Sequence, residues 1–285
     1  MGATIGVLHP GEMGAAIGAQ ARRRGAKVLW CPSGRSQATR DRAEKAGLLP
    51  VDDLGELLDT CEVVLSVSSA TAAVQVATQV ARHGFKGLYV EANATSPQRC
   101  IRVAQRLIGS GAEVLDAAIF GTPPRDDNSD NGVTTALYMA GRRADMETVS
   151  LLFQGSAIET LALTGGIGTA SALKMAHAGY QKATAVLAAV SHALAARYGV
   201  NEELITEARH TARSPLAEPQ RLPSVAAQAW RWTPELHEIA DTLEAEELPR
   251  DLALAAAAIL FRWHDDKDNP NLPLEAVLAR LADFT

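Results

Sequence analysis

Residues 4–14 read T-I-G-V-L-H-P-G-E-M-G, and this stretch decides the fold. The apolar run over residues 4–8 has the length and composition of a buried strand. A turn with two glycines follows it, and residues 13–24 then show the spacing of an amphipathic helix. A strand, a glycine turn and a helix in this order match the G-x-G-x-x-G fingerprint of a dinucleotide-binding fold.

Two of the three glycines of that fingerprint are present. Gly11 stands where the backbone must approach a pyrophosphate and Gly14 where the helix packs closely on the strand, whereas His9 occupies the first position. The N-terminus of the following helix offers unpaired N–H groups and the positive end of its dipole to a phosphate. We therefore predict that the turn binds a dinucleotide cofactor through His9, Pro10, Gly11, Glu12, Met13 and Gly14.

Beyond the turn, short apolar runs alternate with helical stretches through the first half of the chain. The pattern predicts strands over residues 4–8, 27–30, 63–67, 87–90 and 113–118, with 134–140 and 157–161 extending the sheet. It predicts helices over residues 13–24, 36–46, 71–83 and 98–108, and one near 145–154. This alternation is typical of βαβ units, so the predicted fold class is α/β: a Rossmann-type, doubly wound parallel sheet over residues 1–163.

The character of the sequence changes at Gly165. Residues 169–197 contain only Gly179 as a helix breaker and are apolar on most faces, which predicts a long helix that is buried by its neighbours. Further helices are predicted over residues 202–213, 225–229, 234–244, 252–262 and 274–281, with prolines such as Pro234 between them. Residues 164–285 are therefore predicted to form an all-α domain. Because few residues remain to cover the long helix, we also predict a homodimer through these C-terminal helices.

Composition excludes several classes of partner. The chain has 27 Lys and Arg against 33 Asp and Glu, a formal net charge of −6, which argues against a nucleic-acid or membrane partner. Cys31, Cys61 and Cys100 are odd in number and widely spaced, so a full disulfide framework is excluded and no metal site is predicted. A cytoplasmic location is the expectation. The uncharged run at residues 183–196 is too short to span a bilayer.

The residues after the second predicted strand bear on the choice of cofactor. An NAD site carries Asp or Glu about twenty residues after the turn, to bind the ribose 2′-hydroxyl, and Cys31 stands there instead. Ser33 and Arg35 follow, and a hydroxyl beside a guanidinium suits a 2′-phosphate. We therefore predict that NADP(H) is preferred over NAD(H), with Ser33 and Arg35 in contact with it. The alternative is that Arg35 and Arg40 only solvate the start of a helix.

Lys174 lies inside the long predicted helix. Its neighbours at three and four residues are Ala170, Ser171, His177 and Ala178, and all but the histidine are small enough to leave room for a ligand. A lysine that loses its hydration there has a lowered pKa, which suits proton transfer. Two alternatives stay open: Lys174 extends from the helix to solvent, and His177 is a histidine of the core or its edge.

Together these motifs resemble the β-hydroxyacid dehydrogenase and 6-phosphogluconate dehydrogenase superfamily over nearly the whole chain. The turn keeps the two glycines and the methionine of that family's G-x-G-x-M-G. Residues 91–97 (E-A-N-A-T-S-P) are similar to the loop that borders the nicotinamide, and residues 116–122 (D-A-A-I-F-G-T) to the substrate loop. Gly165, Gly168 and Lys174 fit the catalytic signature G-x-x-G-x-G-x-x-x-K-x-x-N-N. Residues 229–240 resemble a subgroup with a C-terminal domain of unknown function.

The resemblance implies an NAD(P)-dependent dehydrogenase or reductase that acts on a small hydroxy acid or keto acid. In this prediction Lys174 is the general acid/base, and His177 orients the substrate or relays a proton. The remaining cofactor contacts are predicted at Ser68 and Asn93, and the contacts to a carboxylate substrate at Thr95, Gly121, Thr122 and Ser171.

Several residues depart from the family pattern. His177 and Ala178 replace the Asn pair of the catalytic signature, and Lys174-Met175 followed by His177 looks more like the K-M-x-H-N-G of 6-phosphogluconate enzymes. In the substrate loop, Phe120 and Thr122 replace Ser and Gly. Two other classes therefore stay open. One is an NADPH-dependent imine reductase, although those relatives generally lack a lysine at the position of Lys174. The other is a non-catalytic nucleotide-binding regulatory protein.

Overall fold

The structure is a computed structural model, which describes residues 2–125, 135–210 and 218–282. The chain divides into two compact units, Met1–Lys174 and Met175–Thr285. The division falls inside one long helix, α7 (Thr169–Tyr198), whereas the sequence predicts a boundary before it, between residues 163 and 164. In the described part of the chain, we find no helix with both the length and the apolar character needed to cross a membrane.

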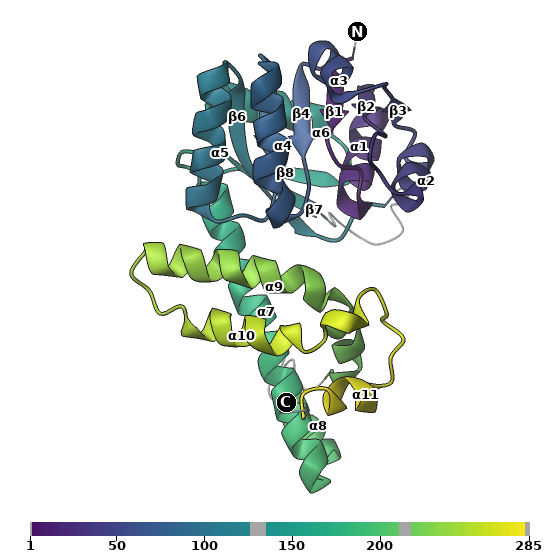
Figure 1. The fold of residues 1–285 in the computed structure, drawn as a ribbon, viewed down its shortest axis with the longest axis vertical. Helices are drawn as coiled ribbons and strands as arrows, with labels where there is room; N and C mark the ends of the chain where they lie inside the picture. The colour runs from purple at the N-terminus through teal and green to yellow at the C-terminus, as the bar shows by residue number, and fades with distance from the viewer. Residues whose placement is uncertain (1, 126–134, 211–217, 283–285) are drawn as a thin grey trace. The chain divides into compact units, whose positions relative to one another are not determined.

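The first unit is built on one eight-stranded sheet in the order β3-β2-β1-β4-β5-β6-β7-β8 (Figure 1). All neighbouring strands are parallel except β6 and β7, which pair antiparallel. The strands are β1 (Thr4–Val7), β2 (Lys27–Trp30), β3 (Leu49–Pro50), β4 (Val63–Ser66), β5 (Leu88–Glu91), β6 (Glu113–Gly121), β7 (Thr135–Ala140) and β8 (Ile158–Ala162). The predicted α/β Rossmann fold is confirmed.

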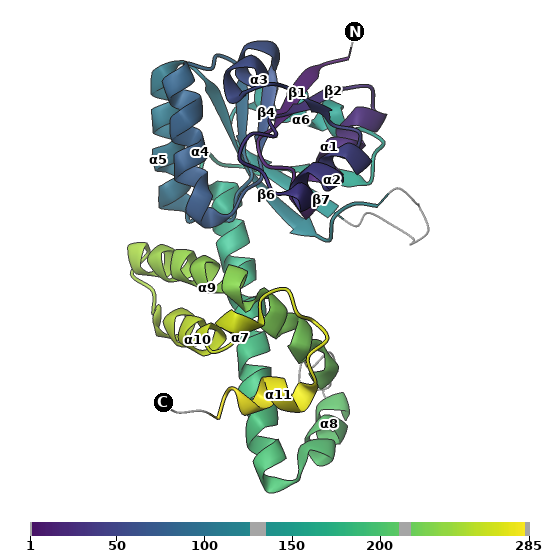
Figure 2. The same ribbon diagram turned by 45° about the vertical axis from the view of Figure 1, so that its right-hand side comes forward.

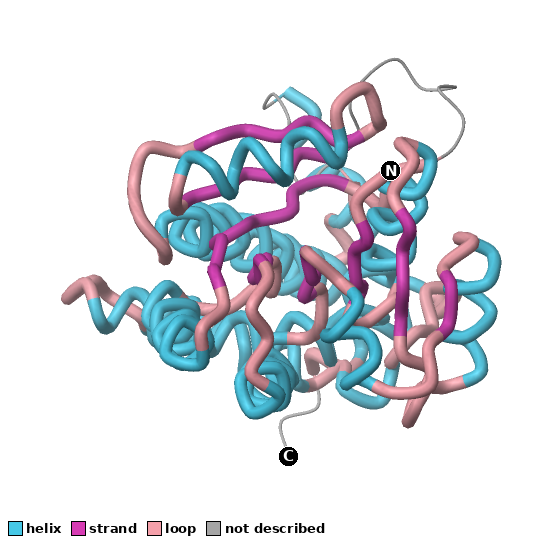
Figure 3. Tube along the Cα trace, turned by 90° about the horizontal axis from the view of Figure 1, so that it is seen from above, coloured by secondary structure: helices cyan, strands magenta, loops and turns pink. Residues whose placement is uncertain are grey.

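Helices cover both faces of this sheet, whose twist is visible in Figure 3. One apolar core joins the strands to α1 (Glu12–Arg23), α2 (Gln37–Lys45) and α6 (Arg143–Phe153). The other joins them to α3 (Leu54–Thr60), α4 (Ala70–His83) and α5 (Pro97–Ser110). Side chains of a strand alternate between the two cores: Ile5 and Val7 lie in the first, and Leu8 in the second.

The position of β1 creates the crevice in which nucleotides bind in such sheets. β1 pairs with β2 on one side and with β4 on the other, so the chain leaves this point of the sheet in opposite directions. Ligands of open α/β sheets bind outside the carboxyl ends of the strands at this switch point. The turn after β1 and the loops after β2 and β4 therefore lie at the expected place.

The sequence analysis missed two short elements, β3 and α3. The start of α3 carries a capping box that could have revealed it, because Asp53 accepts a hydrogen bond from the Glu56 N–H at 2.9 Å. The Glu56 carboxylate in turn accepts one from the Asp52 N–H at 2.8 Å. The signal for β3 is weaker, since two residues are too few to show a period.

The second unit is helical (Figure 2). It contains the rest of α7, then α8 (Asn201–His210), α9 (Leu222–Ala245), α10 (Asp251–Phe261) and α11 (Leu274–Ala279), with short 3-10 turns at Pro219–Arg221 and His264–Asp266. Residues 211–213, predicted to end the helix after α7, lie outside the described residues. The prediction of two helices around Pro234 is wrong, because α9 continues through that proline. α9 packs against α10, and tertiary packing of this kind supplies most of the stability of a helix in a protein.

Candidate cofactor and active site

The turn after β1 has the shape of a phosphate cradle. A Cβ on Gly14 would lie 2.3 Å from the carbonyl oxygen of His9, so only glycine fits there. The Gly11 N–H donates to the His9 carbonyl at 2.9 Å, which closes the turn. Gly11 is the N-cap residue of α1 and, as a glycine, has no side chain with which to cap the first N–H groups of that helix. Such an open helix N-terminus fits a dinucleotide phosphate.

His9 is held by the residue predicted to select the cofactor. Arg35 Nη1 lies 3.0 Å from His9 Nδ1, and Arg35 Nη2 donates to the Leu8 carbonyl at 2.9 Å. The imidazole is also close to the turn, since a Cβ on Gly11 would lie 3.4 Å from His9 Cδ2. The loop after β2 and the turn after β1 are thereby tied together at the switch point.

Arg42 adds a second guanidinium that the sequence analysis missed. It lies on α2, half-buried, and its Nη2 donates to the Thr39 hydroxyl at 3.2 Å. Burial lowers the pKa of His9, and the charges of Arg35 and Arg42 lower it further. No local pattern in the sequence marks Arg42, because Arg35 lies in the loop before α2 and only the fold brings the charge of Arg42 near His9. Ser33, predicted beside Arg35, is exposed.

Asn93 and Ser68 are brought together, but the Asn93 amide faces inward. Its oxygen accepts from the Ser68 N–H and, at 3.0 Å, from the Ser68 hydroxyl. Its nitrogen donates to the Ser66 hydroxyl at 2.9 Å and to a carboxylate oxygen of Glu91. With both donors and both acceptors in use, the amide joins the loops after β4 and β5. In this geometry it is the backbone of those loops, rather than the Asn93 amide, that can contact a cofactor.

Glu91 is a completely buried carboxyl group at the end of β5. Burial raises its pKa to about 8, and the charge of Asp116 on β6 adds to the rise. The sequence analysis quotes both acids as parts of motifs but gives neither a role. An acidic residue at the end of an otherwise apolar strand is the sequence pattern from which such a buried carboxyl group could have been predicted.

Asp116 closes the N-terminus of α7. One carboxylate oxygen accepts from the backbone N–H groups of Gly168, Ala170 and Ser171 at 2.8, 2.9 and 3.1 Å. The other accepts from the Ser171 hydroxyl at 2.7 Å. Ser171, predicted to contact the substrate, thus has its hydroxyl directed at Asp116. This buried cap fixes where α7 begins and therefore where Lys174 stands.

Lys174 reaches the carboxyl end of β6. Its Nζ donates to the Ile119 carbonyl at 2.6 Å and lies 4.7 Å from the centre of the Phe120 ring. The chain then turns at Gly121, whose φ of +97° favours glycine, and continues to the exposed Thr122. The structure therefore gathers the predicted general acid/base and two predicted substrate residues at one strand end.

The other two predicted residues are placed differently. Thr95 is buried in the loop after β5, where its N–H donates to the Asn93 carbonyl at 2.9 Å. His177 is exposed and lies one helical turn beyond Lys174 on α7, within the second unit. Across the described ranges, no three His, Cys, Asp or Glu side chains are grouped to hold a metal ion.

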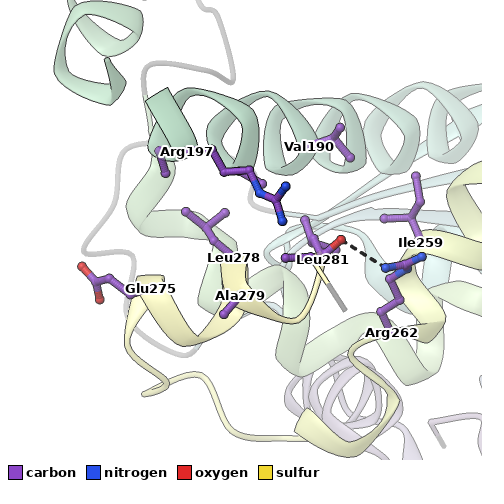
Figure 4. Close-up of a pocket in the computed structure, with 11 residues that line it drawn as sticks. Val190, Arg197, Ile259, Arg262, Glu275, Leu278, Ala279 and Leu281 are labelled. Atoms are coloured by element: carbon purple, nitrogen blue, oxygen red, sulfur yellow. Dashed lines mark hydrogen bonds between the residues drawn. The ribbon is translucent and has the colours of Figure 1, made fainter. Parts of the chain in front are cut away.

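A cavity of about 590 Å³ in the second unit contains none of the predicted site residues. Side chains from α7, α10 and α11 line it, including Val190, Arg197, Ile259 and Leu278 (Figure 4). Arg262 donates to the Leu281 carbonyl at 3.1 Å, which holds the segment after α11 against α10.

The sheet, its switch point and the open glycine turn define an NAD(P)-binding protein of the Rossmann class. Comparison with known families places it more closely. The model of the NAD binding domain of 6-phosphogluconate dehydrogenase matches residues 4–165, and the chain belongs to that family. A domain of unknown function, DUF1932, matches residues 195–263, as expected for the predicted subgroup.

The following relatives share a modest fraction of their residues with this chain. An uncharacterized 28.5 kDa protein of Methanothermus fervidus is 26% identical over 201 residues, which cover 70% of this chain and 74% of that protein. The 3-hydroxyisobutyrate dehydrogenase of Salmonella typhimurium is 18% identical, with 97% and 99% of the chains covered and a TM-score of 0.74. An imine reductase variant of Myxococcus stipitatus, solved with NAD+, is also 18% identical, with 99% and 100% covered and a TM-score of 0.58. The fold is thus that of the hydroxyacid dehydrogenases.

Proposed function

We propose that the protein is an NADP(H)-dependent oxidoreductase that interconverts a small hydroxy acid and its keto acid. The observation that carries the proposal is the position of Lys174, whose Nζ is held 2.6 Å from the Ile119 carbonyl beside Gly121 and Thr122. This places a proton donor at the carboxyl edge of the sheet that also carries the glycine turn. The family resemblance gives the same residue the role of general acid/base.

Each residue has a defined task in this proposal. A bound nicotinamide supplies the hydride chemistry. Lys174 Nζ gives a proton to the substrate oxygen during reduction and takes it back during oxidation. The Thr122 hydroxyl and the Gly121 backbone bind the substrate carboxylate, and His177 orients the substrate. Asp116 is a positioning residue, because it sets the start of α7 and hence the location of the lysine.

Replacing the lysine tests the proposal. Lys174→Met keeps an unbranched side chain of similar length but removes the ammonium group. It should lower kcat for a keto acid at least about a hundredfold while NADPH still binds. Lys86→Met is the matched control, because Lys86 also donates to a backbone carbonyl, that of Ser110 at 2.7 Å, but lies at the other end of β5. It should leave kcat unchanged. Turnover near the wild-type rate in Lys174→Met would remove the lysine from the mechanism.

The same assay separates the other two classes. A cyclic imine can carry its own proton before it binds, so an imine reductase would retain activity in Lys174→Met. The fold shared with the M. stipitatus enzyme supports testing this substrate. NADPH binding without turnover on either a hydroxy-acid panel or a cyclic-imine panel would instead favour a regulatory nucleotide-binding protein.

The preference for NADP(H) rests on the arginines after β2. Arg35 and Arg42 place two guanidinium groups at the switch point, and no acidic side chain follows β2 to bind a ribose 2′-hydroxyl. Arg35→Ala should weaken NADPH binding at least tenfold, about 1.4 kcal/mol, and leave NADH binding nearly unchanged. Arg40→Ala, an exposed arginine on the same helix, is the control. Equal losses for the two cofactors would refute the assignment.

A homodimer through the C-terminal helices is the second part of the proposal. Large apolar side chains of α7 face solvent, among them Tyr180, Leu187 and Tyr198, which are 73%, 55% and 77% exposed. The exposed Phe261 at the end of α10 adds to this apolar surface of the second unit. An apolar surface of this kind is typical of a homodimer interface.

Light scattering at micromolar concentration tests the assembly. A dimer has twice the chain mass of 30.1 kDa. Leu187→Glu should shift the mass toward that of one chain, whereas Leu151→Glu, at a leucine of α6 that is even more exposed, should not. A fully active wild type with the mass of one chain would refute the dimer.

A further inference from the structure

We infer that His9 is a specificity-determining residue that takes up a proton when a ribose 2′-phosphate binds Arg35. In the bound state the imidazolium and the guanidinium then face the phosphate together. The inference rests on the proposed preference for NADP(H). It adds a role for the histidine that replaces the first glycine of the turn.

The contact between His9 and Arg35 permits only one protonation state of the histidine. A guanidinium has N–H donors and no acceptor, so His9 Nδ1, 3.0 Å from Arg35 Nη1, must accept and cannot carry a proton. The imidazole is therefore neutral, with its hydrogen on Nε2. Protonation of His9 requires Arg35 to move, and any ligand that draws Arg35 away leaves Nδ1 open to a proton.

The charges around His9 also favour the neutral imidazole when no ligand is bound. Arg35 lies in the loop after β2 and Arg42 on α2, and both favour the neutral imidazole, in addition to burial. The nearest acid in the turn, Glu12, is exposed to water, which screens its charge. A phosphate monoester carries close to two negative charges at neutral pH. Placed against Arg35 and Arg42, it reverses the local field and favours the imidazolium.

The position of the ring keeps His9 within reach of the same ligand. Its Cδ2 and Nε2 atoms lie 3.4 and 3.5 Å from the point that a Cβ on Gly11 would occupy, so the imidazole borders the phosphate turn. Among the residues that the structure describes, neither Arg35 Nε nor Arg42 Nε has a hydrogen-bond acceptor, and both atoms are buried. Both guanidinium groups thus have donors to offer to phosphate oxygens once the side chains rearrange. Residues from the turn and from the loop after β2 would then bind one anion.

Titration calorimetry of the full chain at pH 7.5, in two buffers of different ionisation enthalpy, measures the proton directly. The probe is adenosine 2′,5′-bisphosphate, and 5′-AMP is the arm that lacks the 2′-phosphate. The free 2′-phosphate is already a dianion at this pH, since its second pKa is about 6. The wild type should take up about 0.5 proton or more per site with the bisphosphate, and close to none with 5′-AMP.

His9→Asn is the matched variant, because its side-chain oxygen can still accept from Arg35 but does not titrate. It should bind the bisphosphate without proton uptake. Between pH 7 and 8.5 the wild-type affinity for NADPH should fall about three- to tenfold relative to this variant. His9→Gly, which restores the usual turn, should also bind without uptake, so the test does not depend on the folding of one variant.

Two results would overturn the inference alone: equal uptake in the wild type and His9→Asn, or equal uptake with 5′-AMP and the bisphosphate. The second would assign the proton to the phosphate common to both ligands. NADPH binding without proton uptake removes the role of His9 and leaves the NADP(H) preference standing. If the wild type binds neither NADPH nor the bisphosphate, the preference and the inference both fall.

Discussion

Two helix N-termini in the first unit differ in whether a side chain satisfies their backbone N–H groups. The start of α1 has Gly11 at its N-cap position, which offers no side chain to the first N–H groups of the helix. The start of α7 is closed by the buried carboxylate of Asp116, which accepts from three backbone N–H groups and the Ser171 hydroxyl. One helix end is open to a ligand, and the other is satisfied by the protein itself.

The difference shows how to distinguish a binding site from a structural cap. Both ends carry the same partial positive charge, because both are helix N-termini. At α7 the protein supplies the anion, so the helix becomes a fixed support for Lys174. At α1 it supplies bare backbone and, nearby, Arg35 and Arg42, so an incoming phosphate completes the site.

Removal of the cap should produce the largest effect. Asp116→Ala leaves the N–H groups of Gly168, Ala170 and Ser171 buried without an acceptor, which should lower the free energy of unfolding by about 3–5 kcal/mol. Urea denaturation measures it. Asp116→Asn retains one accepting oxygen and should lose about half as much. If Asp116→Ala is as stable as the wild type, the cap does not hold the helix.

A second test compares the two buried carboxyl groups. Asp116 is well supplied with donors, whereas Glu91 has its pKa raised to about 8, mainly by burial. Native Glu91 keeps its proton up to that pH, while the unfolded chain loses it near the ordinary value of 4.5. The native state therefore binds more protons between these values, and stability is lost as the pH rises from about 4.5 to 8.

Glu91→Gln removes this titration and keeps the shape of the side chain. The stability of the variant relative to the wild type should rise by up to about 1.4 kcal/mol per pH unit across that window and level off above pH 8. Chemical denaturation at a series of pH values is the measurement. Parallel stability curves for the two proteins would show that Glu91 is not held neutral.

The smallest effects should come from the open turn, where glycine is favoured at two positions for different reasons. A Cβ on Gly14 would lie 2.3 Å from the His9 carbonyl, so Gly14→Ala should cost about 1–3 kcal/mol of stability. A Cβ on Gly11 meets only the His9 ring at 3.4 Å, so Gly11→Ala should cost about 0.5 kcal/mol. It should nevertheless weaken NADPH binding, because a methyl group then stands in the phosphate cradle. Thermal melts and cofactor titration separate the two, and identical behaviour would contradict the cradle.

Much of the fold could be predicted from local sequence. Period and length of the apolar runs revealed every strand of the sheet except β3, and the long helix, because each pattern is contained within a few residues. The two halves expected around Pro234 are one helix, since a long-range contact with α10 outweighs a local helix breaker. The antiparallel direction of β7 also depends on strand pairing that no local pattern records.

The site shows the same division. The glycine turn and Lys174 stand out in the sequence by residue type and spacing, so both can be predicted as site residues without a structure. The direction of the Asn93 amide does not, because its four hydrogen bonds go to Ser66, Ser68 and Glu91, and the two serines stand more than twenty residues earlier in the chain. The charge of Arg42 at His9 is equally invisible in a linear pattern.

By itself, the sequence determined that this chain forms a βαβ sheet with an open phosphate turn followed by helices, because periodicity and glycine act over a few residues. Only the tertiary structure decided which polar groups are already satisfied. Asp116 finds its donors more than fifty residues further along the chain, and Arg35, in the loop after β2, finds His9 in the turn after β1. Hydrogen-bond partners are chosen by proximity in space, and that proximity exists only once the sheet and its helices are assembled.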